Sequence, residues 1–211
     1  MPLTLPPLYP ITPENLRGSA LLAWAADLID SGCGLLQYRR KDGPDGERLQ
    51  DLEALLALVR PRGGRIIVDD RVDLCLLADA DGVHLGQDDM APAEARQMLG
   101  AGKIIGLSTH SLRQVEDALE EPVDYLALGP VFPTATKANP DSVVSREIQE
   151  AAIARSALPL AAIGGITPGT ARDLWARGFA SLAVIGALSR NPGDVWRAFM
   201  AASPGTGASG A

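Results

Sequence analysis

The chain has 211 residues, of which 46% are hydrophobic and only 4% aromatic, so aliphatic side chains must fill its core. The formal net charge of −7 excludes the broad basic surface that a sequence-independent nucleic-acid binder needs. Cys33 and Cys75 stand alone, without the spacing of a metal site, which predicts free thiols and a reducing compartment.

The N-terminal segment and the longest apolar run bear on where the protein works. Met1–Pro10 has no basic segment followed by an apolar stretch, so we expect no signal peptide. The longest apolar run, Ala20–Ile29, is interrupted by Asp27 and is too short to span a bilayer. These features predict a soluble, cytoplasmic protein with no membrane or nucleic-acid partner.

Short apolar runs alternate with helical patterns eight times along the chain. The predicted strands are Leu8–Thr12, Leu35–Arg39, Arg65–Asp69, Gly82–Leu85, Lys103–Leu107, Tyr125–Leu128, Leu160–Ile163 and Ser181–Ile185. The predicted helices are Ala20–Ile29, Glu47–Val59, Val72–Leu77, Ala93–Leu99, Leu112–Leu119, Arg146–Ala154, Thr170–Ala176 and Pro192–Met200. Ser111 and Thr167–Pro168 are expected to cap two of these helices.

This alternation predicts an α/β fold, a single-domain (β/α)8 TIM barrel over residues 1–202, because strands that alternate with helices run parallel. A doubly wound open sheet is the alternative, since local patterns do not show closure. The remaining residues, 203–211, are small and polar, and we expect them to form a disordered tail.

Cationic residues follow the second predicted strand. Side chains alternate along a strand, so Gln37, Arg39 and Lys41 share one side. Two cations and an amide at a strand end form a plausible diphosphate clamp. The alternative interpretation is that Arg39–Lys41 is an ordinary solvated run of charge.

Carboxylates follow the third and fourth strands. Asp69 and Asp70 end one strand, and Asp88 and Asp89 follow the next. Because carboxyl ends of barrel strands meet at one rim, these clusters can hold a hard cation, and Mg2+ prefers a few carboxylates completed by phosphate oxygens and water. Either pair taken alone is more simply a loop carboxylate or a helix cap.

Phosphate-binding features follow the later strands. Ser108 follows the fifth strand, and the loop after the sixth carries Thr134, Thr136 and Lys137, whose hydroxyls and cation suit phosphate. The seventh and eighth strands end in glycine turns, whose exposed amides at the usual barrel phosphate site can bind phosphate. The glycines concerned are Gly164, Gly165 and Gly186. The only two histidines, His84 and His110, are each more often structural, and two cannot form a convincing zinc site.

Four segments, taken in order, resemble the thiamine-phosphate synthase family, and the resemblance runs from about Leu8 to Leu188. They are Gln37-Tyr38-Arg39-x-Lys41, Gly82-Val83-His84-Leu85-Gly86-Gln87-x-Asp89, Gly129-Pro130-Val131-Phe132-Pro133-Thr134-x-Thr136-Lys137 and Ala162-Ile163-Gly164-Gly165-Ile166. The second and third segments are specific, whereas the Gly-Gly turn is not.

The resemblance implies a transferase that condenses hydroxymethylpyrimidine diphosphate with thiazole phosphate, giving thiamine phosphate and diphosphate. By analogy, the pyrimidine diphosphate would contact Gln37, Arg39 and Lys41, helped by Ser108 and Lys137, and Asp69 stands at a further substrate-binding position. Mg2+ would be bound by Asp70 and Asp89. The thiazole phosphate would be held by Thr134, Thr136, Gly165, Ile185 and Gly186. The route would be dissociative, through a pyrimidine cation, and catalysis would be electrostatic, with Mg2+, Arg39, Lys41 and Lys137 stabilising the charge that develops on the leaving diphosphate.

Two positions depart from the family pattern. Asp69 stands where the family usually has asparagine, and Gly186 where it usually has serine. The nearest enzyme alternative is a related thiazole tautomerase that shares the barrel. The two changes also allow a non-catalytic protein that binds thiamine precursors or phosphate. Retention of Gln87-x-Asp89 and Thr134-x-Thr136-Lys137 argues against the tautomerase. The sequence leaves the oligomeric state open.

Overall fold

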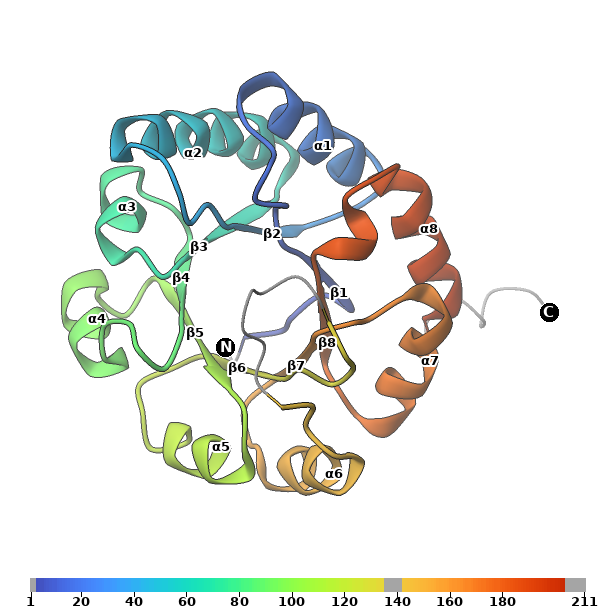
Figure 1. The fold of residues 1–211 in the computed structure, drawn as a ribbon. Helices are drawn as coiled ribbons and strands as arrows, with labels where there is room; N and C mark the ends of the chain where they lie inside the picture. The colour runs from blue at the N-terminus through green and yellow to red at the C-terminus, as the bar shows by residue number, and fades with distance from the viewer. Residues whose placement is uncertain (1–2, 135–141, 204–211) are drawn as a thin grey trace.

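The computed structural model describes residues 3–134 and 142–203, in which eight parallel strands form a ring enclosed by helices (Figure 1). The strands are β1 (Leu8–Pro10), β2 (Leu35–Tyr38), β3 (Arg65–Asp69), β4 (Gly82–Leu85), β5 (Ile104–Thr109), β6 (Tyr125–Leu128), β7 (Leu160–Ile163) and β8 (Ser181–Val184). The α-helices are α1 (Gly18–Asp30), α2 (Asp45–Val59), α3 (Val72–Leu77), α4 (Pro92–Leu99), α5 (Leu112–Ala118), α6 (Arg146–Arg155), α7 (Pro168–Arg177) and α8 (Pro192–Ala202). Two 3-10 turns, η1 (Arg60–Arg62) and η2 (Gly186–Leu188), follow α2 and β8.

The sheet closes between its first two strands. Its hydrogen-bonded order is β1-β8-β7-β6-β5-β4-β3-β2. β1 meets β2 through one isolated parallel bridge between Ile11 and Gln37, and the Thr12 amide donates to the Gln37 carbonyl over 2.9 Å. The Thr12 hydroxyl also donates to the Arg39 carbonyl and accepts from the Arg39 amide. The predicted barrel is therefore confirmed, and the open sheet is excluded.

The predicted elements all occur, with small shifts at their ends. β1 stops at Pro10 rather than Thr12, because beyond it only the isolated bridge continues the pairing. β5 runs on to Thr109 because Ser108 and Thr109 stay in register with β6. Both predicted caps are present: the Ser111 hydroxyl accepts from the Gln114 amide, and the Thr167–Pro168 pair begins α7. The predicted tail lies outside the described residues, except for Ser203.

Apolar side chains form two cores, one on each face of the sheet. The larger core lies between the strands and the surrounding helices and is mostly aliphatic, as the composition predicts. The smaller core fills the barrel interior with Leu5, Tyr9, Ile11, Leu35, Ile67, Tyr125, Ala127, Ala161 and Ala183. Four of these residues, Tyr9, Ile11, Ala127 and Ala183, also line a cavity at the carboxyl ends of the strands.

The two cysteines are buried free thiols, as the sequence predicts. None of the described helices is both long enough and apolar enough to cross a bilayer. The reducing compartment and the cytoplasmic location stay predictions from the sequence.

Gly82 on β4 lies where the sheet leaves no room for a side chain. A Cβ atom there would stand 2.2 Å from the carbonyl oxygen of Ile104 on β5. We expect Gly82→Ala to lower the free energy of unfolding by about 1–3 kcal/mol, as overpacking does. Urea denaturation measures this, with Gly102→Ala as control because a Cβ there meets nothing within 4 Å. Equal stability of the two variants would contradict the close approach.

Candidate active site

The carboxyl ends of the strands surround a cavity of about 910 Å3. Every predicted site residue that the structure describes lines it: Gln37, Arg39, Lys41, Asp69, Asp70, Asp89, Ser108, Thr134, Gly165, Ile185 and Gly186. The other two, Thr136 and Lys137, lie outside the described residues. The topology thus brings residues from separate strand ends to one rim, while their individual roles stay predictions.

The basic run after β2 divides between two faces. Gln37, Arg39 and Lys41 line the cavity, as the strand alternation predicts. Arg40 points the other way and donates to Asp51 at 2.8 Å and Glu47 at 2.6 Å, both on α2. Because the side chains of Arg39 and Arg40 are only 10% and 6% exposed, the solvated-run interpretation is wrong for these two residues.

Carboxylates hold both cations of the cavity. Arg39 pairs with Glu14 at 2.6 Å and, through Nε, with Asp69 at 3.4 Å. Lys41 Nζ lies 2.9 Å from Asp69 Oδ2 and also contacts Asp70. Burial alone would lower the pKa of Lys41, but the two aspartates outweigh it and raise that pKa. Lys41 is therefore positively charged at neutral pH.

Asp69 is the buried member of this cluster, with a side chain 10% exposed. Burial, with a smaller contribution from the neighbouring Asp70, raises its pKa to about 6. Lys41 and Arg39 act in the opposite direction. The carboxylate that replaces the family's asparagine therefore pairs with the two cations, so a diphosphate would meet positive charge that is already partly balanced.

Asp70 and Asp89 stand at the rim of the cavity. Asp70 adopts a left-handed backbone conformation, with φ of 59°, just beyond β3. Asp89 Oδ2 accepts from the Gly86 amide at 2.7 Å. Burial and the neighbouring Asp70 raise the pKa of Asp89 against the effect of that amide, so the two carboxyl groups lie close enough to interact.

Two neighbouring carboxylates fit Mg2+, which takes few protein ligands and completes its shell with phosphate oxygens and water. Among the described residues no group of three or more His, Cys, Asp or Glu side chains could hold a metal ion. Asp70 and Asp89 therefore offer two carboxylate ligands, and phosphate oxygens and water would complete the shell.

A chain of hydrogen bonds crosses the barrel interior beneath the cavity. Gln37 Nε2 donates to the Tyr9 hydroxyl at 3.3 Å, and the Tyr9 and Tyr125 hydroxyls are 3.0 Å apart. His84 Nδ1 lies 2.9 Å from the Tyr125 hydroxyl, and His84 Nε2 lies 2.9 Å from Ser108 Oγ. Sequence reasoning identified only the two ends of this chain. Strand alternation could have shown that Tyr9 and His84 face inward, but not that Tyr125 links them.

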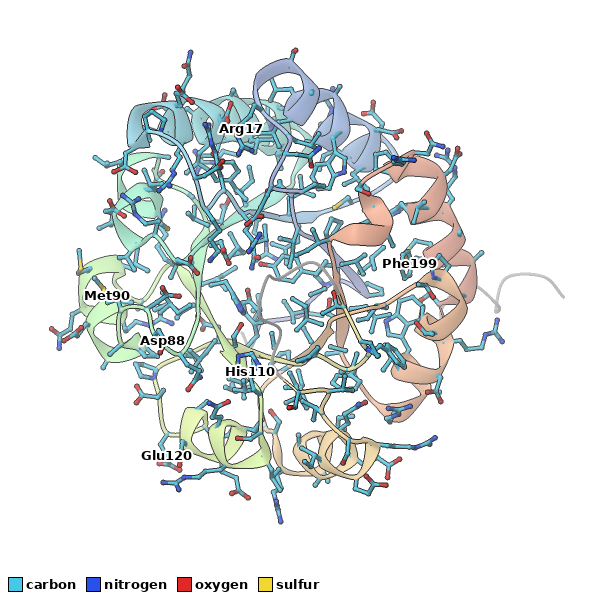
Figure 2. The ribbon with its side chains drawn as sticks, viewed as in Figure 1. Arg17, Asp88, Met90, His110, Glu120 and Phe199 are labelled. Carbon is cyan, nitrogen blue, oxygen red and sulfur yellow. The ribbon has the colours of Figure 1, made fainter. Side chains whose placement is uncertain are left out.

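A glycine turn after β7 and the short 3-10 turn η2 after β8 also line the cavity. Gly164 and Gly165 have φ of 102° and 64°, and a Cβ on Gly165 would stand 2.5 Å from the Pro133 carbonyl oxygen. Nearby, His110 Nδ1 lies 2.7 Å from the Gly129 carbonyl oxygen, and Figure 2 shows His110 on the inner side of the ring near β5. Glycine is thus required where the β7 turn passes under the β6 loop.

The family model described as thiamine monophosphate synthase matches residues 8–188. The chain belongs to this family. A thiamine-phosphate synthase from Chlorobium luteolum is 42% identical over 175 residues, which cover 82% of each chain. One from Synechococcus sp. is 45% identical over 171 residues, 80% of this chain but 48% of that protein. The chain therefore spans about half the length of this curated relative.

A solved structure of another family member has the same architecture. Thiamine phosphate pyrophosphorylase from Pyrococcus furiosus superposes with a TM-score of 0.83 at 30% identity, over 93% of this chain and 94% of that one. The family's barrel and the cavity-lining motifs after β2, β4, β6 and β7 therefore occur together in this chain.

Proposed function

We propose that the protein joins hydroxymethylpyrimidine diphosphate to thiazole phosphate, forming thiamine phosphate and releasing diphosphate. The observation that carries this proposal is the cavity itself, in which Arg39 and Lys41 lie beside the carboxylates Asp70 and Asp89. The names of the relatives support the same reaction. The cavity of about 910 Å3 is within the range of sites that enclose small molecules.

Each substrate has a proposed set of contacts. The pyrimidine diphosphate would contact Gln37, Arg39, Lys41, Ser108 and Lys137, with Asp69 beside the two cations. The thiazole phosphate would contact Thr134, Thr136, Gly165, Ile185 and Gly186. Among the described residues, the first set lies around β2, β3 and β5, and the second lies around β7, β8 and the start of the loop after β6. This separation would let the two substrates meet at the centre of the cavity.

The leaving diphosphate needs its charge neutralised. Asp70 and Asp89 would hold Mg2+, which when bound supplies positive charge to the diphosphate oxygens. Arg39 and Lys41 already carry fixed positive charge on the same side of the cavity. Groups held in place before the reaction stabilise developing charge without reorganising, and they commonly provide the largest catalytic contribution.

The proposed reaction is a dissociative substitution. The bond between the pyrimidine methylene carbon and the diphosphate oxygen breaks, and its electron pair leaves with the diphosphate. The electron-rich pyrimidine stabilises the resulting cation, and the thiazole nitrogen donates its lone pair to form the new bond. Because that nitrogen carries no proton, the step needs no general base, and Arg39, Lys41 and Lys137 would act by charge alone.

The direct test mixes both substrates with the purified protein and Mg2+. We expect thiamine phosphate and diphosphate to appear in equal amounts, and a strong chelator to abolish both. Ligand binding without diphosphate release would instead indicate a binding protein. Isomerisation of the thiazole without condensation would indicate a tautomerase.

Gly186 begins η2 at the proposed thiazole-phosphate side, where the family usually has serine. We expect Gly186→Ser to lower the KM for thiazole phosphate by about three- to tenfold, because a hydrogen bond to a charged group contributes about 1.5 kcal/mol or less at an exposed rim. The KM for the pyrimidine diphosphate should stay unchanged. Steady-state kinetics measure both constants, with Gly102→Ser, at a position remote from the cavity, as control. An unchanged KM for thiazole phosphate would exclude this contact.

A further inference from the structure

Gln37 and Ser108, two of the proposed substrate-binding residues, stand at the ends of the interior hydrogen-bond chain. The three residues between them are Tyr9, Tyr125 and His84, of which the two tyrosines are at most 1% exposed and His84 is 6% exposed. Buried polar groups are costly unless they are paired, so the proton positions along such a chain are constrained. The proton positions determine whether the side chain at each end, Gln37 or Ser108, presents a hydrogen-bond donor or an acceptor to a ligand.

The two tyrosine hydroxyls each bring one proton to the chain. Burial raises the pKa of Tyr9 and of Tyr125 well above the ordinary range, so both stay protonated. Gln37 donates to Tyr9, and within the described part of the chain the only other hydrogen bond of the Tyr9 hydroxyl is to Tyr125. The Tyr9 proton therefore points to Tyr125, and the Tyr125 proton points to His84 Nδ1.

This direction fixes the tautomer of the histidine. A neutral imidazole has one donor nitrogen and one acceptor nitrogen. Because Nδ1 of His84 accepts from Tyr125, Nε2 carries the hydrogen and donates to Ser108 Oγ. The Ser108 hydroxyl then has its own hydrogen available, and Ser108 is half-buried and lines the cavity.

We infer that His84 is a positioning residue that makes Ser108 a hydrogen-bond donor towards a phosphate oxygen in the cavity, and that Tyr9 and Tyr125 fix its tautomer from below. The identity of that ligand as the pyrimidine diphosphate rests on the proposed function. The reversed chain would have Ser108 donate to His84 and present only lone pairs to the ligand, which would repel phosphate oxygens.

Close packing at Gly106 and a hydrogen bond from Gln87 fix the His84–Ser108 end of the hydrogen-bond chain. A Cβ on Gly106 would stand 2.1 Å from the Tyr125 ring and 2.5 Å from His84 Nδ1, so only glycine lets this histidine and tyrosine meet across β5. The His84 and Tyr125 ring centroids are 5.4 Å apart. On the rim, Gln87 Nε2 donates to the Ser108 carbonyl at 2.7 Å and fixes the backbone that carries the hydroxyl.

The tautomer can be read directly by 15N NMR of the histidine-labelled protein, and this measurement does not depend on turnover. The chain has only two histidines, and His84→Gln assigns their signals. We expect His84 to be neutral with its hydrogen on Nε2. A hydrogen on Nδ1 would overturn the inference and leave the proposed reaction unaffected.

A double-mutant cycle tests whether the interior hydrogen-bond chain affects ligand binding through Ser108. The probe is inorganic diphosphate with Mg2+, and calorimetry measures its affinity. We expect Ser108→Ala and Tyr125→Phe each to weaken binding by about tenfold, the value of one hydrogen bond to a charged group. In the Ser108→Ala background, Tyr125→Phe should have no further effect, because the residue it acts through is already gone.

The controls separate positioning from stability. Tyr38→Phe removes another buried tyrosine hydroxyl, on the helix-facing side of β2, and should leave diphosphate affinity unchanged. His84→Gln should keep most of the affinity, since one amide can accept from Tyr125 and donate to Ser108. An equal loss from Tyr125→Phe in both backgrounds would show that Tyr125 only supports the fold and would overturn the inference.

Discussion

Replacement of Arg39 by methionine is expected to lower kcat/KM for hydroxymethylpyrimidine diphosphate by about a hundredfold or more, the usual cost of removing one preorganised charge. Arg39 is fixed by Glu14 and Asp69 and lines the cavity, so its charge needs no rearrangement before reaction. Because the leaving diphosphate gains charge towards the transition state, most of the loss should appear in kcat. Single-turnover kinetics would measure the chemical step directly.

The same substitution also removes a partner of a buried carboxylate. We expect Arg39→Met to lower the free energy of unfolding by about 2 kcal/mol, since Asp69 keeps Lys41 but loses one cation. The double variant Arg39→Met/Asp69→Asn should recover that stability without recovering kcat. Arg113→Met, at an 89% exposed side chain, is the control for charge removal. Recovery of kcat in the double variant would show that Arg39 acts only by neutralising Asp69.

The second large effect is expected at the proposed metal site. Asp89→Asn keeps an oxygen for the Gly86 amide but removes the negative charge, so the loop should stay folded. We expect turnover to fall by about a hundredfold or more at low Mg2+, because only two protein carboxylates are proposed to hold the ion. Raising the Mg2+ concentration should restore part of the activity.

Binding of Mn2+, followed by electron paramagnetic resonance, would report on this site independently of turnover. Asp89→Asn should weaken Mn2+ binding, whereas Glu53→Gln on the outer face of α2 should not. Full activity of Asp89→Asn, or activity unchanged by a strong chelator, would refute the assignment.

The sequence predicts the strands and helices because each depends on a local pattern. It also predicts where Arg39, Lys41, Asp70 and Asp89 gather, because parallel strands bring their carboxyl ends to one rim. The same alternation places Arg40 on the opposite face. Its pairing with Asp51 and Glu47 of α2 is what no strand pattern reveals.

Contacts between distant residues are what the sequence alone does not predict. The Tyr9–Tyr125 hydrogen bond joins residues 116 positions apart. Gly106 makes room for the contact between Tyr125 and His84 only once β4, β5 and β6 are in register. The pairing of Asp69 with the two cations is similar, since it depends on β2 and β3 lying side by side. Such contacts follow from strand register rather than from local composition.

β1 and β2 are joined by a single bridge that lies beside the proposed substrate site, so a bound substrate would help to keep the barrel closed. Every other pair of neighbouring strands runs in register over several residues, whereas here the Thr12 side chain takes over part of the hydrogen bonding to Arg39. Local opening should therefore cost least at this point, and the backbone amides of Thr12 and Arg39 should exchange with solvent faster than those of central strands. A diphosphate bound both by Arg39 and by residues across the cavity would connect the two ends of the hydrogen-bonded strand order and stabilise the closed ring. Ligand binding should then slow amide exchange most at the closure of the ring.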